Sequence, residues 1–123
     1  MAAVSTPASA WRDDLGRQLL AARRARDAVR VAALRTAMSA IDNAETPDGP
    51  VPSAGAIADS AAGLGAAEVA RRRLSDADVR AVLRAEIAER LSAAADLIAG
   101  GRADRAEDLR AEADVITRIL DAR

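Results

Sequence analysis

The apolar residues between positions 27 and 45 recur at the spacing of an α-helix. Val31, Leu34, Met38 and Ile41 are separated by three, four and three positions, which places them on one side of a helix. A helix with one apolar side is stable only when another element covers that side. The pattern therefore predicts a helix that packs against other helices.

Residues suited to helix termini indicate where the other helices begin. Thr6 followed by Pro7 is a typical N-cap and first helical residue, and Asp27 can cap the helix that follows. Ser75 with Asp78 three positions later is the acidic form of a capping box. We expect four helices, near residues 9–25, 27–45, 75–99 and 103–120.

The last two expected helices also carry apolar stripes. The stripe of the third helix ends before Gly100 and Gly101, which are suited to a helix C-terminus. Its members are Val79, Val82, Leu83, Ile87, Leu91, Ala94 and Ile98. In the fourth helix we expect inward-facing side chains at Ala106, Leu109, Ala113, Ile116 and Leu120. The fold class is therefore all-α, a small antiparallel helical bundle.

The segment 46–73 separates the two halves of this bundle. It holds three of the four prolines and four of the seven glycines. A connection of this length is unusual inside a compact domain, so we expect a long mobile loop. The expected organisation is a flexible N-terminus over 1–8 and a single helical domain over 9–123. The N-terminus lacks the features of a signal peptide and no stretch is long enough for a membrane span, so we expect a cytoplasmic protein.

The residue types that are absent exclude several kinds of chemistry. The chain has no Cys and no His, which excludes a thiol nucleophile, an imidazole base and a zinc site built from them. All 18 basic residues are Arg, so a lysine Schiff base is excluded as well. Trp11 is the only aromatic residue, too few for a base-stacking platform. We expect no catalytic residues, no metal and no cofactor.

Three stretches in order resemble the GatB/YqeY family. They are "LRTAMSAIDNAE" from Leu34, "LSDADVRAVLRAEIAER" from Leu74 and "GGRADRAEDLRAEADVI" from Gly100. The resemblance covers roughly residues 12–120 when the long loop is treated as an insertion. Its motif residues, which we expect to be structural, are Arg35, Ile41, Asn43, Glu45, Glu86, Arg90, Gly101 and Arg102.

This resemblance implies an accessory role. The family joins small free-standing proteins to the C-terminal region of the B subunit of the glutamine-dependent tRNA amidotransferase, a carbon–nitrogen ligase with glutamine as amide donor. The family's active sites lie in other domains, and the usual second helical tail domain, the part associated with tRNA, is missing here. The resemblance implies a non-catalytic module linked to tRNA-dependent amidation, with weak tRNA binding or an amidotransferase-like partner. The alternative is a protein–protein adaptor that binds another helical protein and has no RNA role.

The first motif ends in three polar residues, Asp42, Asn43 and Glu45. Acidic groups at a helix C-terminus need a positive partner, because that end carries partial negative charge. We expect Arg80 or the arginines at 71–73 to supply it, with Asn43 bonded to carbonyls of the connection. The alternative is a metal site formed by Asp42 and Glu45. Two helices packed antiparallel would also bring Arg35 within reach of Glu86 or Glu89.

An arginine cluster surrounds the expected junction of the first two helices. Arg23, Arg24, Arg26 and Arg30 can share one side of the molecule and contact a phosphate backbone. The alternative is that they are helix-end cations and solvated surface residues, since the whole chain has a net charge of only −1.

Overall fold

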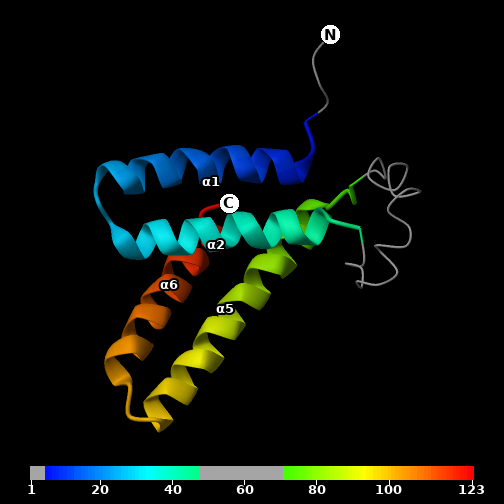
Figure 1. Cartoon of the computed structure of the whole chain (residues 1–123). Coiled ribbons are helices and arrows are strands. Elements are labelled where there is room, and N and C mark those ends of the chain that lie inside the picture. The colour runs from blue at the N-terminus through cyan, green and yellow to red at the C-terminus, as the bar shows by residue number, and fades with distance from the viewer. Residues whose placement is uncertain (1–4, 48–70) are drawn as a thin grey trace, which may run out of the picture.

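The computed structural model describes residues 5–47 and 71–123, and within them the chain is all-α. The helices pack as two antiparallel hairpins, α1 with α2 and α5 with α6 (Figure 1). The described part contains no strand and no helix that is both long and apolar enough to cross a bilayer. The helices are α1 (Pro7–Arg24), α2 (Ala28–Glu45), α5 (Asp76–Ala99) and α6 (Ala103–Asp121).

The helix termini follow the predicted capping residues. The hydroxyl of Thr6 accepts a hydrogen bond from the backbone N–H of Ser9 at 3.1 Å, and Ser75 and Asp78 form the predicted capping box. Helix α1 consequently begins at Pro7, two residues earlier than expected. Ala8, expected in the flexible N-terminus, is fully buried. Residues 48–70, most of the predicted mobile loop, lie outside the described residues.

The core lies where the two hairpins meet. Its largest fully buried side chains come from all four helices: Trp11, Leu15, Leu34, Ile41, Val79, Leu83 and Ile116. The predicted stripe on α2 is therefore in the core, and Met38 and Ile87 pack against it as partly buried residues. Trp11 also anchors α5, because its indole N–H donates to the Asp76 carboxylate at 2.8 Å.

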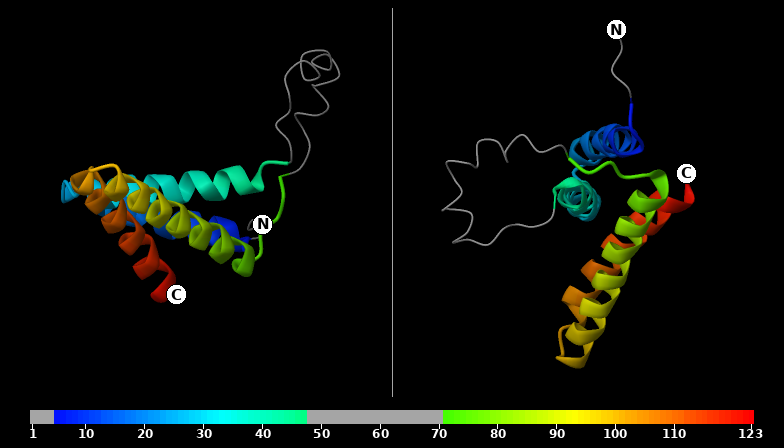
Figure 2. Two further views of the ribbon diagram at one scale, coloured as in Figure 1. Left: turned by 90° about the horizontal axis from the view of Figure 1, so that it is seen from below. Right: turned by 90° about the vertical axis from the view of Figure 1, so that its right-hand side faces the viewer.

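The distal half of the α5–α6 hairpin extends away from α1 and α2 (Figure 2). There Ala94 and Ala106 are buried without belonging to the main core. Two members of the stripe predicted on α5 do not point inward: Leu91 is 48% exposed and Ile98 is 43% exposed. That part of the prediction is wrong, because α1 and α2 cover only the first half of α5.

Candidate functional site

The turn between α1 and α2 presents three arginines on one short segment. After the C-cap residue Ala25, the N–H of Arg26 donates to the carbonyl of Arg23 and the N–H of Asp27 donates to the carbonyl of Ala22, both at 3.0 Å. These two bonds form a Schellman motif, which requires a left-handed residue at the position of Arg26. Arg26 has φ of 56°, a conformation that favours glycine.

The arginines of this turn have no ion-pair partner in the described part of the chain. Arg23, Arg24 and Arg26 are exposed, and none forms an ion pair with another described residue. Arg30 differs, because it is partly buried and its guanidinium donates to the side-chain oxygen of Gln18 at 3.4 Å. The structure therefore groups three of the four predicted RNA-contact residues. We call Arg23, Arg24 and Arg26 the arginine turn.

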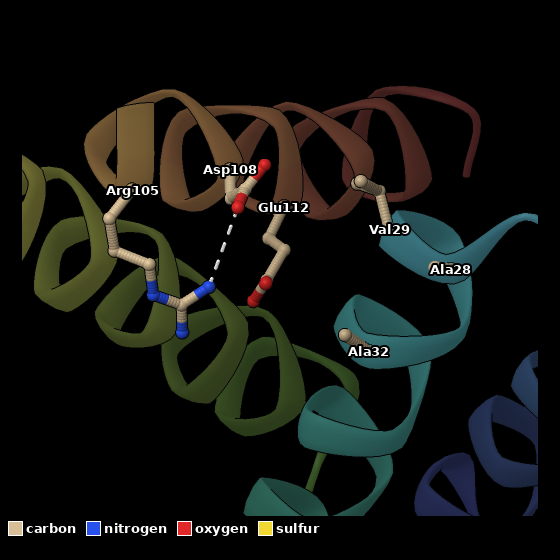
Figure 3. Close-up of a pocket in the computed structure, with 6 residues that line it drawn as sticks. All are labelled: Ala28, Val29, Ala32, Arg105, Asp108 and Glu112. Atoms are coloured by element: carbon tan, nitrogen blue, oxygen red, sulfur yellow. Dashed lines mark ion pairs between the residues drawn. The ribbon is translucent and has the colours of Figure 1, made fainter. Parts of the chain in front are cut away.

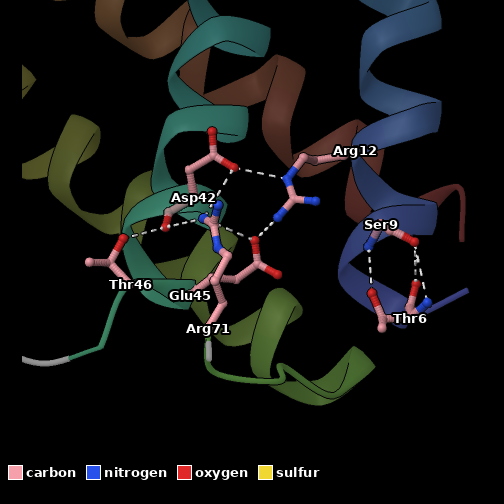
Figure 4. Close-up of polar contacts among 7 residues, drawn as sticks. All are labelled: Thr6, Ser9, Arg12, Asp42, Glu45, Thr46 and Arg71. Carbon is pink, nitrogen blue, oxygen red and sulfur yellow. Dashed lines mark hydrogen bonds and ion pairs between the residues drawn. The ribbon is translucent and has the colours of Figure 1, made fainter. Parts of the chain in front are cut away.

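Arginines from two other segments form ion pairs with the acidic residues at the end of α2 (Figure 4). The guanidinium of Arg12, on α1, donates to Asp42 at 2.8 Å and also forms an ion pair with Glu45. Arg71 lies 3.5 Å from the Glu45 carboxylate and donates to the backbone carbonyl of Asp42 at 3.2 Å. We predicted that an arginine of the segment 71–73 would pair with Asp42 and Glu45, and Arg71 confirms this prediction.

Arg80 does not take part in this cluster, contrary to the other half of that prediction. It pairs with Asp76 at 2.7 Å, one helical turn earlier on α5. The Trp11 ring lies against the guanidinium of Arg123 at 4.1 Å and that of Arg80 at 5.4 Å. Because Trp11 also binds Asp76, Arg80 is held over the start of α5 and away from the end of α2.

The paired state of Asp42 and Glu45 bears on the metal alternative. Both carboxylates face arginines, and Glu45 is only 7% exposed. Among residues 5–47 and 71–123, no group of three or more His, Cys, Asp and Glu side chains is placed to hold a metal ion. The arrangement is that of an ion cluster that closes the end of a helix. We call Arg12, Asp42, Glu45 and Arg71 the end cluster of α2.

Arg12 was missed by the sequence analysis, although a signal was available. In an antiparallel hairpin, residues at equal distances from the turn face each other. Residues that face each other across the α1–α2 hairpin have numbers whose sum is about 54. A side chain placed at Gly16 would contact Met38, and Arg12 pairs with Asp42. We expected α2 to pack against α5 and did not consider α1 as the source of a partner for its acidic residues.

Two further motif arginines, Arg90 and Arg35, differ in their contacts. Arg90 pairs with Glu86 at 2.9 Å and with Glu112 of α6 at 3.2 Å, and all three side chains are largely buried. Arg35 is exposed and, in the part of the chain that the structure describes, pairs with neither Glu86 nor Glu89. That predicted contact is wrong, because the Glu86 carboxylate pairs with Arg90, one turn later on the same helix.

Gly101, Arg102 and Asn43 complete the motif. Gly101 is left-handed, with φ of 81°, and its N–H donates to the carbonyl of Ile98, so the predicted helix stop is confirmed. Arg102 lies 4.0 Å from Asp104 at an exposed site. Asn43 is exposed, its backbone carbonyl accepts a hydrogen bond from the N–H of Thr46, and its side chain forms no hydrogen bond with another described residue.

A pocket of about 230 Å³ lies between α2 and α6 (Figure 3). Its charged residues are already engaged: Arg105 pairs with Asp108 at 3.6 Å, and Glu112 binds Arg90. We therefore assign no chemistry to it. Its lining residues are Ala28, Val29, Ala32, Arg105, Asp108 and Glu112.

Two carboxyl groups at the start of α5 have shifted acidities. Hydrogen bonds from Arg80 and then Trp11 hold the pKa of Asp76 below its ordinary value. The pKa of Asp78 is lowered by hydrogen bonds from the backbone and side chain of Ser75. Both shifts come from helix capping and packing, and both groups stay ionised at neutral pH.

Comparison of the chain with protein-family models, with curated proteins and with solved structures gave no match. The functional assignment therefore depends on the three motif stretches and on the geometry described above.

Proposed function

We propose that this chain is a non-catalytic helical accessory module of the GatB/YqeY type, which acts in the cytoplasm in tRNA-dependent amidation and contacts tRNA weakly through the arginine turn. The link to a carbon–nitrogen ligase that uses glutamine as amide donor comes from the resemblance of the three motif stretches. The supporting observation from the structure is that Arg23, Arg24 and Arg26 are exposed and form no ion pair with described residues.

The arginine turn differs from other arginines because it places three unpaired guanidinium groups within four residues, whereas Arg35, Arg84 and Arg110, also unpaired among the described residues, lie on three separate helices. Arg12, Arg80 and Arg90 are each held by carboxylates, so their charge is already neutralised within the fold. The arginine turn keeps three positive charges available to an external anion. Phosphate groups bind such charges with little dependence on base sequence, so the expected tRNA contact is with the backbone.

The position of Arg26 supports the same proposal. An L-residue other than glycine in the left-handed region costs about 1 kcal/mol, and Arg26 has φ of 56°. The left-handed residue ends α1 directly after Arg23 and Arg24, so the three arginines lie within four residues at the end of the hairpin. A use for the guanidinium would offset the cost of placing it there.

The test is the salt dependence of tRNA binding. Three phosphate contacts correspond to a log–log slope of about 2.1 to 2.7, so affinity should fall roughly 20- to 40-fold between 50 and 200 mM salt. The variant R23Q/R24Q/R26Q should lose most of this slope. The control variant R35Q/R73Q/R110Q removes the same charge from exposed residues that likewise form no ion pair with described residues, and it should keep the slope.

Equal slopes in the two variants would contradict the proposal, because binding would then reflect net charge alone. Negligible RNA binding by the parent chain would contradict it as well and would favour the protein–protein adaptor. The specific observation in favour of the adaptor is the exposure of Leu91 and Ile98 on α5.

A further inference from the structure

Helix α5 exposes a second apolar face, opposite the one that packs in the fold. Val79, Leu83 and Ala94 point inward, whereas Leu91 and Ile98, about a quarter-turn around the helix from them, are close to half exposed at the edge of the outer face. These two are seven residues apart, so they lie on one line along the helix. A helix that is apolar on both sides is normally covered on both sides.

The exposed face has the periodicity of a two-helix contact. Its central residues are spaced four, three, four, three and four apart, which is the heptad pattern that keeps a seam facing a partner helix. All six are small and exposed, which permits close approach of another helix. They are Ala81, Ala85, Ala88, Ser92, Ala95 and Ala99.

Charged residues on the two edges of this face show which helix fits it. One edge carries Arg84 with Leu91 and Ile98, and the other carries Glu89 and Asp96. Neither Arg84 nor Glu89 has an ion-pair partner among residues 5–47 and 71–123. They are five residues apart on opposite edges, which is the spacing at which g and e positions of two parallel helices form ion pairs.

We propose that the outer face of α5 pairs two copies of this chain through parallel α5 helices, with Arg84 of each copy bound to Glu89 of the other. In a parallel two-fold pair, each edge meets the opposite edge of the second copy, so the two charges meet twice. An antiparallel two-fold pair brings each edge against itself. Glu89 and Asp96 would then face acidic residues of the second copy, which is unfavourable.

The hairpin geometry is compatible with this pairing. The distal half of α5 extends away from α1 and α2, as the right-hand view in Figure 2 shows. The seam begins at Ala81, an exposed residue in the first half of α5, continues along the distal half and ends at Ala99, before the turn to α6. This surface lies on a different helix from the arginine turn, so the dimer and the tRNA contact are independent proposals.

The first test is the mass of the full chain in sedimentation equilibrium over a range of concentrations. The mass should rise from 12.7 kDa toward twice that value. R84E and E89R should each weaken association by about tenfold, since each places two like-charged pairs across the seam. The double variant R84E/E89R should restore association, because the pair is then only reversed.

The second test uses the absence of cysteine from the chain. In a parallel pair the two copies of residue 92 lie at the same level, so S92C should form a disulfide-linked dimer under mild oxidation. S39C, at an exposed serine on α2, is the matched control and should not. A monomer at every concentration would overturn the proposal, and so would a dimer that neither charge reversal weakens.

Discussion

Removal of Arg12 tests how strongly the end cluster of α2 stabilises the fold. The Glu45 side chain is only 9% exposed and that of Arg12 is 28% exposed. In R12A, Glu45 keeps Arg71 at 3.5 Å but loses its other partner, and Asp42 loses its 2.8 Å bond. Removing one partner of a buried pair costs about 3–5 kcal/mol. Because Arg71 remains and the site is partly solvated, we expect about 2 kcal/mol.

The assay is urea and thermal unfolding followed by the fluorescence of Trp11, the only aromatic residue, which is fully buried. A loss of about 2 kcal/mol corresponds to a fall in Tm of roughly 6–12 °C for a domain of this size. The control is R17A, because Arg17 is 72% exposed and its ion pair with Asp14 is long, at 3.5 Å. That exposed pair should contribute less than about 0.5 kcal/mol. If R12A were as mild as R17A, the end cluster would not stabilise the fold.

Four further perturbations test the helix termini and the connection. R26G should raise the free energy of unfolding by about 1 kcal/mol, and G101A should lower it by a similar amount, because both positions are left-handed; urea midpoints that move the other way would contradict this. The pKa of Asp76 is lower in the folded chain, first because of Arg80, so its contribution is present above about pH 4 and is lost as pH falls below that value. D76N should therefore flatten the loss of urea resistance between pH 6 and pH 3, and an unchanged slope would refute the assignment. Replacing residues 48–70 by a short Gly/Ser linker should keep the helical circular dichroism signal and raise the free energy of unfolding by up to about 1 kcal/mol. The reason is that the N–H of Arg72 donates to the carbonyl of Glu45 at 2.8 Å, so the two ends of the connection are already close. Unfolding of this variant would show that the segment is required.

Local features of the sequence predicted the helices and their ends. A cap depends on residues within one turn, so Thr6, Ser75 and Gly101 could be identified without knowledge of the packing. The left-handed turn at Arg26 could not, because glycine is the usual signal and arginine carries none.

Contacts between helices were predicted less well. The choice of Arg35 as partner of Glu86 failed because the rotation of each helix in the bundle is not fixed by an apolar stripe alone. Leu91 and Ile98 fit the inward stripe by spacing, yet they are exposed because the hairpin extends beyond the residues that could cover them. Their exposure is therefore a property of the tertiary arrangement.

The central claim is that tRNA contacts the arginine turn, and backbone amide chemical shifts measured during a tRNA titration at low salt test it most directly. Shifts should concentrate on residues 22–27, in fast exchange, and should vanish in R23Q/R24Q/R26Q. The amides of the outer face of α5 should not respond to tRNA. Shifts confined to α5, or no shifts at any tRNA concentration, would contradict the account.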